Sequence, residues 1–153
     1  MASSRFSTAV HVLALLAKAK SENLKSEMIA RSVNTNPVVI RRLLCALNCA
    51  GLVVSQTGAA GGTRLTRSAE QITLLEVYRA ISPREVFALH SQEPSQHCSV
   101  GRNIEAVLAE LQGEVSRAIE QKLAQFTLQD VIRSVENRQR SCSEEERMKV
   151  WLM

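Results

Sequence analysis

The chain has 153 residues and a mass of 16.9 kDa, the size of one domain or of one small domain with an appended element. Apolar residues make up 45% and charged residues 22% of it, so collagen-like, coiled-coil-only and fully disordered chains are excluded. Four cysteines are too few for a secreted disulfide scaffold of this length and favour a cytoplasmic location. The apolar run 8–17 is too short to span a bilayer, so no membrane association is expected.

The charge is distributed unevenly along the chain. Residues 1–67 carry nine Lys or Arg against two acidic residues, a net charge of +7, whereas residues 68–153 carry ten against thirteen, a net charge of −3. Between Met28 and Arg67 there are five arginines and no acidic residue. This asymmetry favours a front half that faces nucleic acid and a rear half with another role.

Three helices are expected in the front half. Apolar residues at helical spacing predict a first helix over about 5–19, capped by Ser3 or Ser4, and a short second helix from its cap at Ser26 to Val33. Asn36 is a preferred N-cap residue and Pro37 suits the first helical position, so a third helix should run from there to Gly51. The second and third helices form a helix-turn-helix pattern.

A β-hairpin should follow these helices. Residues 52–57 and 63–66 have strand character, and the glycine-rich stretch 58–62 between them predicts a loop. Three helices followed by a hairpin make up a winged helix-turn-helix. The expected fold class is therefore mainly α with a small β-hairpin.

The rear half is expected to be helical as well. A fourth helix over 72–81 should stop at Ser82 and Pro83, and an irregular segment 84–99 should lead into a long helix over about 100–125 with a near-heptad apolar seam. Thr127 and Asp130 resemble a capping box for a last short helix that ends near Val135. These elements divide the chain into a winged domain at 1–82, a sensory loop with dimerisation helices at 83–136, and a mobile tail at 137–153.

The second helix of a helix-turn-helix places its outer face in the major groove of DNA. Arginines there can bind guanine edges or phosphates, Asn can bond a base or a phosphate, and Val can contact a thymine methyl group. In the hairpin, loop glycine lets the backbone approach a phosphate and arginines neutralise charge. The candidate DNA-binding residues are Asn36, Val38, Val39, Arg41, Arg42, Cys45, Gly61, Arg64 and Arg67.

Several ordered segments together resemble the Rrf2 family of bacterial transcriptional regulators, the group that includes IscR, NsrR and CymR. They are 26–33, 34–43, 50–53, 58–62, 72–80 and 98–104, and the resemblance covers about residues 3–135. Within the family, the chain resembles the YwnA-like members. The resemblance implies a homodimer held together by the long helix, a reading helix at 36–45, a wing at 56–64, and a near-palindromic operator on double-stranded DNA.

The chain departs from the family pattern at two places. Thr57 and Thr63 stand where members often have a basic and an aromatic residue, which weakens the expected grip of the wing. Iron–sulfur members carry three closely spaced cysteines before the long helix, whereas this chain has only Cys98 there. One thiolate cannot hold a conventional cluster, so no metal or other cofactor is expected.

Cys98 is a candidate sensor of oxidants or electrophiles, because it stands beside His97 and before a helix N-terminus. A thiol that merely packs is the alternative. Modification of Cys45 would alter the reading surface and offers a second route to redox control, while a disulfide from Cys45 to Cys49 is not expected on one helix.

The chain is expected to be a dimeric, sequence-specific DNA-binding regulator that represses transcription. The sequence also leaves open a winged-helix adaptor that binds proteins, and a thiol-dependent enzyme at Cys98 is a weaker alternative. No arrangement of acids, serine and histidine indicates catalysis, so the chain is not expected to be an enzyme.

Overall fold

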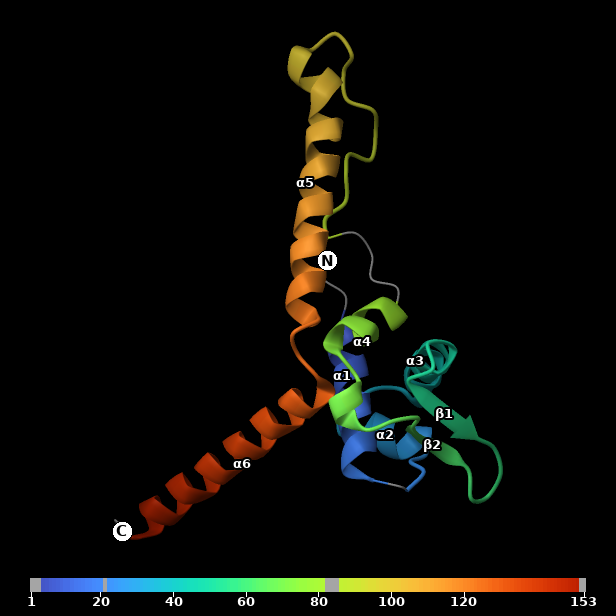
Figure 1. Cartoon of the computed structure of the whole chain (residues 1–153), viewed down its shortest axis with the longest axis vertical. Coiled ribbons are helices and arrows are strands. Elements are labelled where there is room, and N and C mark those ends of the chain that lie inside the picture. Colours follow the sequence, from blue (N-terminus) through green and yellow to red (C-terminus); the bar gives the residue numbers. More distant parts are fainter. Residues whose placement is uncertain (1–3, 21, 82–85, 152–153) are drawn as a thin grey trace.

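The computed structural model describes residues 4–20, 22–81 and 86–151, with side chains up to residue 141. A head formed by α1–α4 and a hairpin lies at one side, while α5 and α6 extend from it in different directions (Figure 1). The expected fold class, mainly α with a small β-hairpin, is confirmed: the described residues form helices and one two-stranded antiparallel sheet.

The head is built around α1 (Arg5–Lys18), α2 (Ser26–Val33) and α3 (Pro37–Cys49). Each helix buries one apolar stripe, because apolar residues recur every three or four positions. The buried side chains of α3 are those expected from the sequence: Ile40, Leu43, Leu44 and Leu47.

Among the three helices α1–α3, the start of α3 agrees with expectation and the starts of α1 and α2 differ. The side chain of Asn36 accepts a hydrogen bond from the Val38 backbone N–H at 2.8 Å, which confirms the predicted cap of α3. Ser4 stands at the N-cap of α1 but makes no side-chain capping bond. Ser26 is the first residue of α2 and not its cap, which is Lys25 in extended conformation.

The turn between α2 and α3 is made by Asn34 in the left-handed conformation, with φ of 57°. Asparagine tolerates this region better than most residues. The turn fixes the direction in which α3 leaves α2, and so fixes which face of α3 is left outside.

The hairpin consists of β1 (Val53–Gln56) and β2 (Gly62–Leu65), with Val53 opposite Leu65 and Gln56 opposite Gly62. Thr63 is buried and exchanges two backbone hydrogen bonds with Leu24, of 3.0 and 2.8 Å. The segment between α1 and α2 therefore holds the hairpin against the head like a third strand.

A 3₁₀ turn, η1 (Ala69–Gln71), leads into α4 (Leu74–Ala80). The Thr73 hydroxyl accepts from the Glu76 N–H, and the Glu76 carboxylate accepts from the Thr73 N–H, which is a complete capping box. The expected stop at Ser82 and Pro83 lies outside the described residues.

The long helix α5 (Ser99–Leu123) lies close to its expected range and buries none of its 25 residues within the single chain. It is preceded by the irregular stretch 86–98, also as expected. Val100, Val107 and Leu111 on α5 are 63%, 56% and 46% exposed, which leaves an apolar stripe without cover in the monomer.

The last helix, α6 (Leu128–Trp151), is longer than predicted. Its capping box is confirmed, because Asp130 accepts from the Thr127 N–H at 2.8 Å and Thr127 Oγ1 accepts from the Asp130 N–H at 3.2 Å. The predicted end near Val135 is wrong. No proline or glycine follows Gly113, so nothing in the sequence interrupts a helix there, although the residues lack an apolar stripe.

Candidate DNA-binding face

The outer face of α3 carries large side chains that the head does not cover. Val38 and Val39 in its first turn are 45% and 49% exposed, and Arg42 and Cys45 are exposed one and two turns further on. Exposed apolar side chains that gather at one place and are bordered by polar residues mark interaction surfaces. This face is therefore suited to contact another surface.

Arg41 and Arg42 differ although they are neighbours. Arg41 donates to the Glu27 carboxylate at 2.8 Å and to Ser26 Oγ at 3.3 Å, and so ties α3 to α2. The Arg41 hydrogen bond is the main cause of the lowered pKa of Glu27. Arg42 has no ion pair or hydrogen bond from its side chain within the described part of the chain, so its guanidinium is available to a ligand.

Asn36 is partly committed to the fold. Its side-chain oxygen caps α3, so this atom is not available to accept from a base. Its amide nitrogen can still donate to a phosphate at the helix N-terminus, where backbone N–H groups also favour an anion.

The arginines of the hairpin show the same contrast. Arg67 donates to Glu76 at 2.6 Å and so belongs to the network that caps α4. Arg64 is exposed on β2 and makes no ion pair among the described residues. Of the four candidate arginines, the structure thus leaves Arg42 and Arg64 unpaired.

Gly61 has a different role from the expected approach to a phosphate. It is buried, and its N–H already donates to the Gly58 carbonyl at 3.0 Å. A Cβ at this position would lie 2.4 Å from the Gln56 carbonyl oxygen. Glycine is therefore needed to close the loop, and the exposed loop residues are 57–60.

Asn23 is a functional candidate that no sequence motif indicates. Its amide donates to the Ala60 carbonyl at 3.3 Å and to Gln56 Oε1 at 3.5 Å, so it positions the loop of the wing. Only the folded structure identifies Asn23, because its two partners are 33 and 37 residues away in the sequence.

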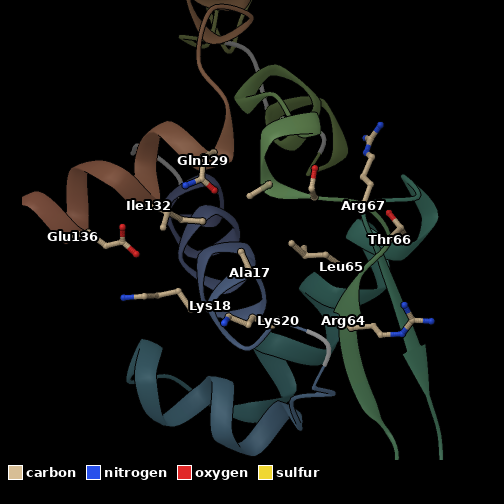
Figure 2. Close-up of a pocket in the computed structure, with 12 residues that line it drawn as sticks. Ala17, Lys18, Lys20, Arg64, Leu65, Thr66, Arg67, Gln129, Ile132 and Glu136 are labelled. Carbon is tan, nitrogen blue, oxygen red and sulfur yellow. The ribbon is translucent and has the colours of Figure 1, made fainter.

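A groove of about 800 Å³ lies behind the hairpin, between the end of α1, the β2–η1 segment and α6 (Figure 2). Lys18 and Lys20 line its α1 side, Arg64 and Arg67 its hairpin side, and Glu136 its α6 side. Basic side chains therefore line the groove both at the end of α1 and along the hairpin.

Cys98 lies at the N-cap of α5 and is exposed. The backbone N–H groups of Gly101 and Val100 lower the pKa of its thiol, because they stabilise the thiolate at a helix start. Cys45 and Cys49 lie on α3, in the head. Cys98 is far from them, because α5 begins at the end of this helix that points away from the head (Figure 1).

A helix-turn-helix with its reading face exposed and a hairpin beside it defines the class of winged-helix DNA-binding proteins. The family model described as Rrf2, iron-dependent transcriptional regulator, matches residues 2–134. The chain therefore belongs to the Rrf2 family of transcriptional regulators, and it is a regulator and not an enzyme.

Individual relatives agree with this assignment. The chain is 42% identical to the candidate HTH-type transcriptional regulator YwnA of Bacillus subtilis (strain 168), over 86% of this chain and 97% of YwnA. The crystal structure of a candidate DNA-binding protein is 38% identical, with a TM-score of 0.67, and covers 84% of this chain and 98% of its own. IscR of T. potens shares the fold at 23% identity, with a TM-score of 0.68 over 91% of this chain and 90% of its own.

The family description names iron, and the donor atoms of this chain do not fit such a site. In the segments that the structure describes, no three His, Cys, Asp or Glu side chains gather closely enough to hold a metal ion. Cys98 at the start of α5 belongs to no such group among the described residues, and the His90 and Glu105 side chains lie 4.0 Å apart.

None of the helices in the described part of the chain has the length and hydrophobicity that a membrane-spanning segment requires.

Proposed function

We propose that the chain is a homodimeric, sequence-specific repressor that reads a near-palindromic operator with α3 and grips the flanking phosphates with the hairpin. The observation that carries this proposal is the exposed outer face of α3, where Val38, Val39, Arg42 and Cys45 have no cover from the head. Arg64 on the adjacent hairpin supplies a second guanidinium that has no ion pair among the described residues.

The residues of this face divide into two roles. Arg42 and Arg64 would contact DNA directly, with the two valines against thymine methyl groups and the Asn36 amide on a phosphate. Arg41 and Arg67 would act mainly through the fold, because each is engaged by a carboxylate. Gly61 would act by shaping the loop.

A second copy of the chain is the proposed cover for α5. The exposed stripe of Val100, Val107 and Leu111 repeats at intervals of seven and four residues, which is typical of a helix that packs along another helix. Two heads on such a pair would meet two half-sites of similar sequence. A dimer bound over a promoter would exclude RNA polymerase, and for this reason we propose that the chain represses transcription. We propose the cytoplasm as its location.

The test is selection of duplexes from a random pool by the full-length chain, followed by binding of the selected duplex at several salt concentrations. Replacing Arg42 and Arg64 with alanine should weaken binding and reduce the salt slope by about 0.9 for each lost phosphate contact. Arg102→Ala on α5 is the matched control and should bind like the unaltered chain. If no duplex is enriched while a stoichiometric protein partner is found, the chain is a winged-helix adaptor and not a DNA-binding repressor.

Cys98 is the proposed sensor of oxidants, because its thiol is exposed and the α5 N-terminus lowers its pKa. Affinity for the selected duplex should fall after mild peroxide treatment and should not fall in Cys98→Ser. Equal losses in the two proteins would reject Cys98 as the switch.

A further inference from the structure

Two thiols stand on the outer face of α3, one helical turn apart. Cys45 and Cys49 are both exposed and free, and neither has a hydrogen-bond partner within the described residues. They continue the stripe that begins with Val38 and Arg42, because these four positions are separated by three or four residues. The chain therefore presents two soft nucleophiles side by side on its candidate reading face.

The spacing of the pair selects what can bridge it. Residues four apart on a helix have Cβ atoms about 5–6 Å apart, whereas a disulfide requires about 3.5–4.5 Å. The hydrogen bonds of α3 oppose the closer approach. A single atom bonded to both sulfurs spans the longer gap, so the geometry favours a chelated soft element over a direct S–S bond.

We propose that Cys45 and Cys49 form a dithiol site for trivalent arsenic compounds. Thiolates are soft ligands that prefer soft, thiophilic centres, and a trivalent arsenic with one organic substituent takes two of them. Two sulfurs on one rigid helix make the second As–S bond intramolecular, which favours the cyclic adduct over two separate thiol adducts.

The chemistry balances without an oxidant or a reductant. With phenylarsine oxide, each thiol forms one As–S bond, both bonds between arsenic and oxygen are broken, and the two thiol protons leave with the oxygen as water. Arsenic stays trivalent and both sulfurs stay at the thiol oxidation level. The site is thus distinct in chemistry and in position from the proposed peroxide sensor at Cys98.

Occupancy would place a bulky group on the face that we propose reads DNA. This consequence rests on the proposed function, whereas formation of the adduct does not. The two are therefore measured separately, first by intact-protein mass spectrometry and then by DNA binding.

The experiment uses the full chain with Cys98 and Cys142 replaced by serine, so that only the α3 pair remains. Incubation with phenylarsine oxide should add one phenylarsine group per chain with loss of water, in a form that survives excess glutathione and is removed by 2,3-dimercaptopropanol. Cys45→Ser or Cys49→Ser in this background should leave only an adduct that glutathione removes. An adduct in the starting protein that glutathione strips, or one that persists in either single variant, would overturn the proposal.

The functional arm measures affinity for the selected duplex before and after the arsenical. Affinity should fall by about tenfold or more, the scale of losing one base contact, and should return with 2,3-dimercaptopropanol. A stable adduct with unchanged affinity would leave the dithiol site in place and contradict the proposed reading face instead.

Discussion

The head and the long helix α5 differ in how far they bury their apolar side chains. In the head, α1, α2 and α3 each turn an apolar stripe inward, and residues such as Leu13, Ile40 and Leu47 are almost fully buried. Along α5 no residue is buried, and Val100, Val107 and Leu111 are exposed to water. The head thus buries its apolar stripes within one chain, with Leu128 and Ile132 of α6 completing its core, whereas α5 has the pattern of a helix that needs a partner.

The strongest test of this contrast is to place charge in the stripe of α5. Val107→Glu with Leu111→Glu should convert a dimer into a monomer, because carboxylates buried between two helices lose hydration without gaining a partner. Analytical ultracentrifugation over a range of concentrations measures this change. Ala109→Glu, on the opposite side of α5, is the control and should leave association unchanged. If the unaltered chain is a monomer, the conclusion that α5 needs a partner is wrong.

Within the head, Leu47→Ala should lower the free energy of unfolding by about 2–5 kcal/mol, because it leaves a cavity in a packed core. Urea denaturation measures the loss. Met28→Ala, at a position that is 55% exposed on α2, should change stability by less than about 0.5 kcal/mol. Similar losses in the two variants would contradict the assignment of the core.

In the hairpin, Gly61→Ala should cost about 1–3 kcal/mol, because the new Cβ would meet backbone atoms of residues 56–58. Thermal unfolding measures the cost, and amide exchange should show faster opening of the loop. Ala59→Ser at the exposed tip should be close to neutral. If Gly61→Ala keeps full stability, the loop has more room than the structure shows.

At the junction of the head with the rear half, Thr73→Ala should cost about 1 kcal/mol, because the Glu76 N–H loses its capping acceptor. Denaturant titration measures this change. Thr8→Ala is a matched control, since its hydroxyl donates only to the Ser4 carbonyl within a helix and caps no helix start. An equal loss in the control would show that capping is not the cause.

The smallest expected effect concerns pH. Burial raises the pKa of Glu76, but the Thr73 N–H and the Arg67 guanidinium outweigh it, so the net shift is downward. A lowered pKa gives stability that is present in full above the unfolded value of about 4.3 and is lost as the pH falls through the folded value. Glu76→Gln should therefore cost about 0.5 kcal/mol at neutral pH and progressively less below about pH 4.

The matched comparison for the pH effect is Glu70→Gln. Glu70 is 70% exposed and lies 4.0 Å from Arg133, so its replacement should change stability little at any pH. Parallel pH profiles for the two variants would show that the capping network does not couple to protonation.

Much of the fold could be predicted from local sequence signals. Asn36 and Pro37 fix the start of α3, and helical spacing fixes the buried faces of α1 and α3, because these depend on neighbours within one or two turns. The prediction for α6 is too short, because the segment after Val135 is polar and lacks the apolar stripe that indicates a packed helix. The capping box at Thr127 and Asp130 is predicted from its spacing, whereas the box at Thr73 and Glu76 has the same spacing and is absent from the sequence-based prediction.

The candidate site was predictable as a face but not residue by residue. The sequence by itself determined that a basic helix-turn-helix and hairpin precede a long amphipathic helix, and it indicated four arginines as candidate DNA ligands. Only the tertiary structure separated Arg42 and Arg64, which are unpaired among the described residues, from Arg41 and Arg67, which bind Glu27 and Glu76. Those partners are 14 and 9 residues away, so the chain had to fold before its geometry decided which charges remain for a ligand.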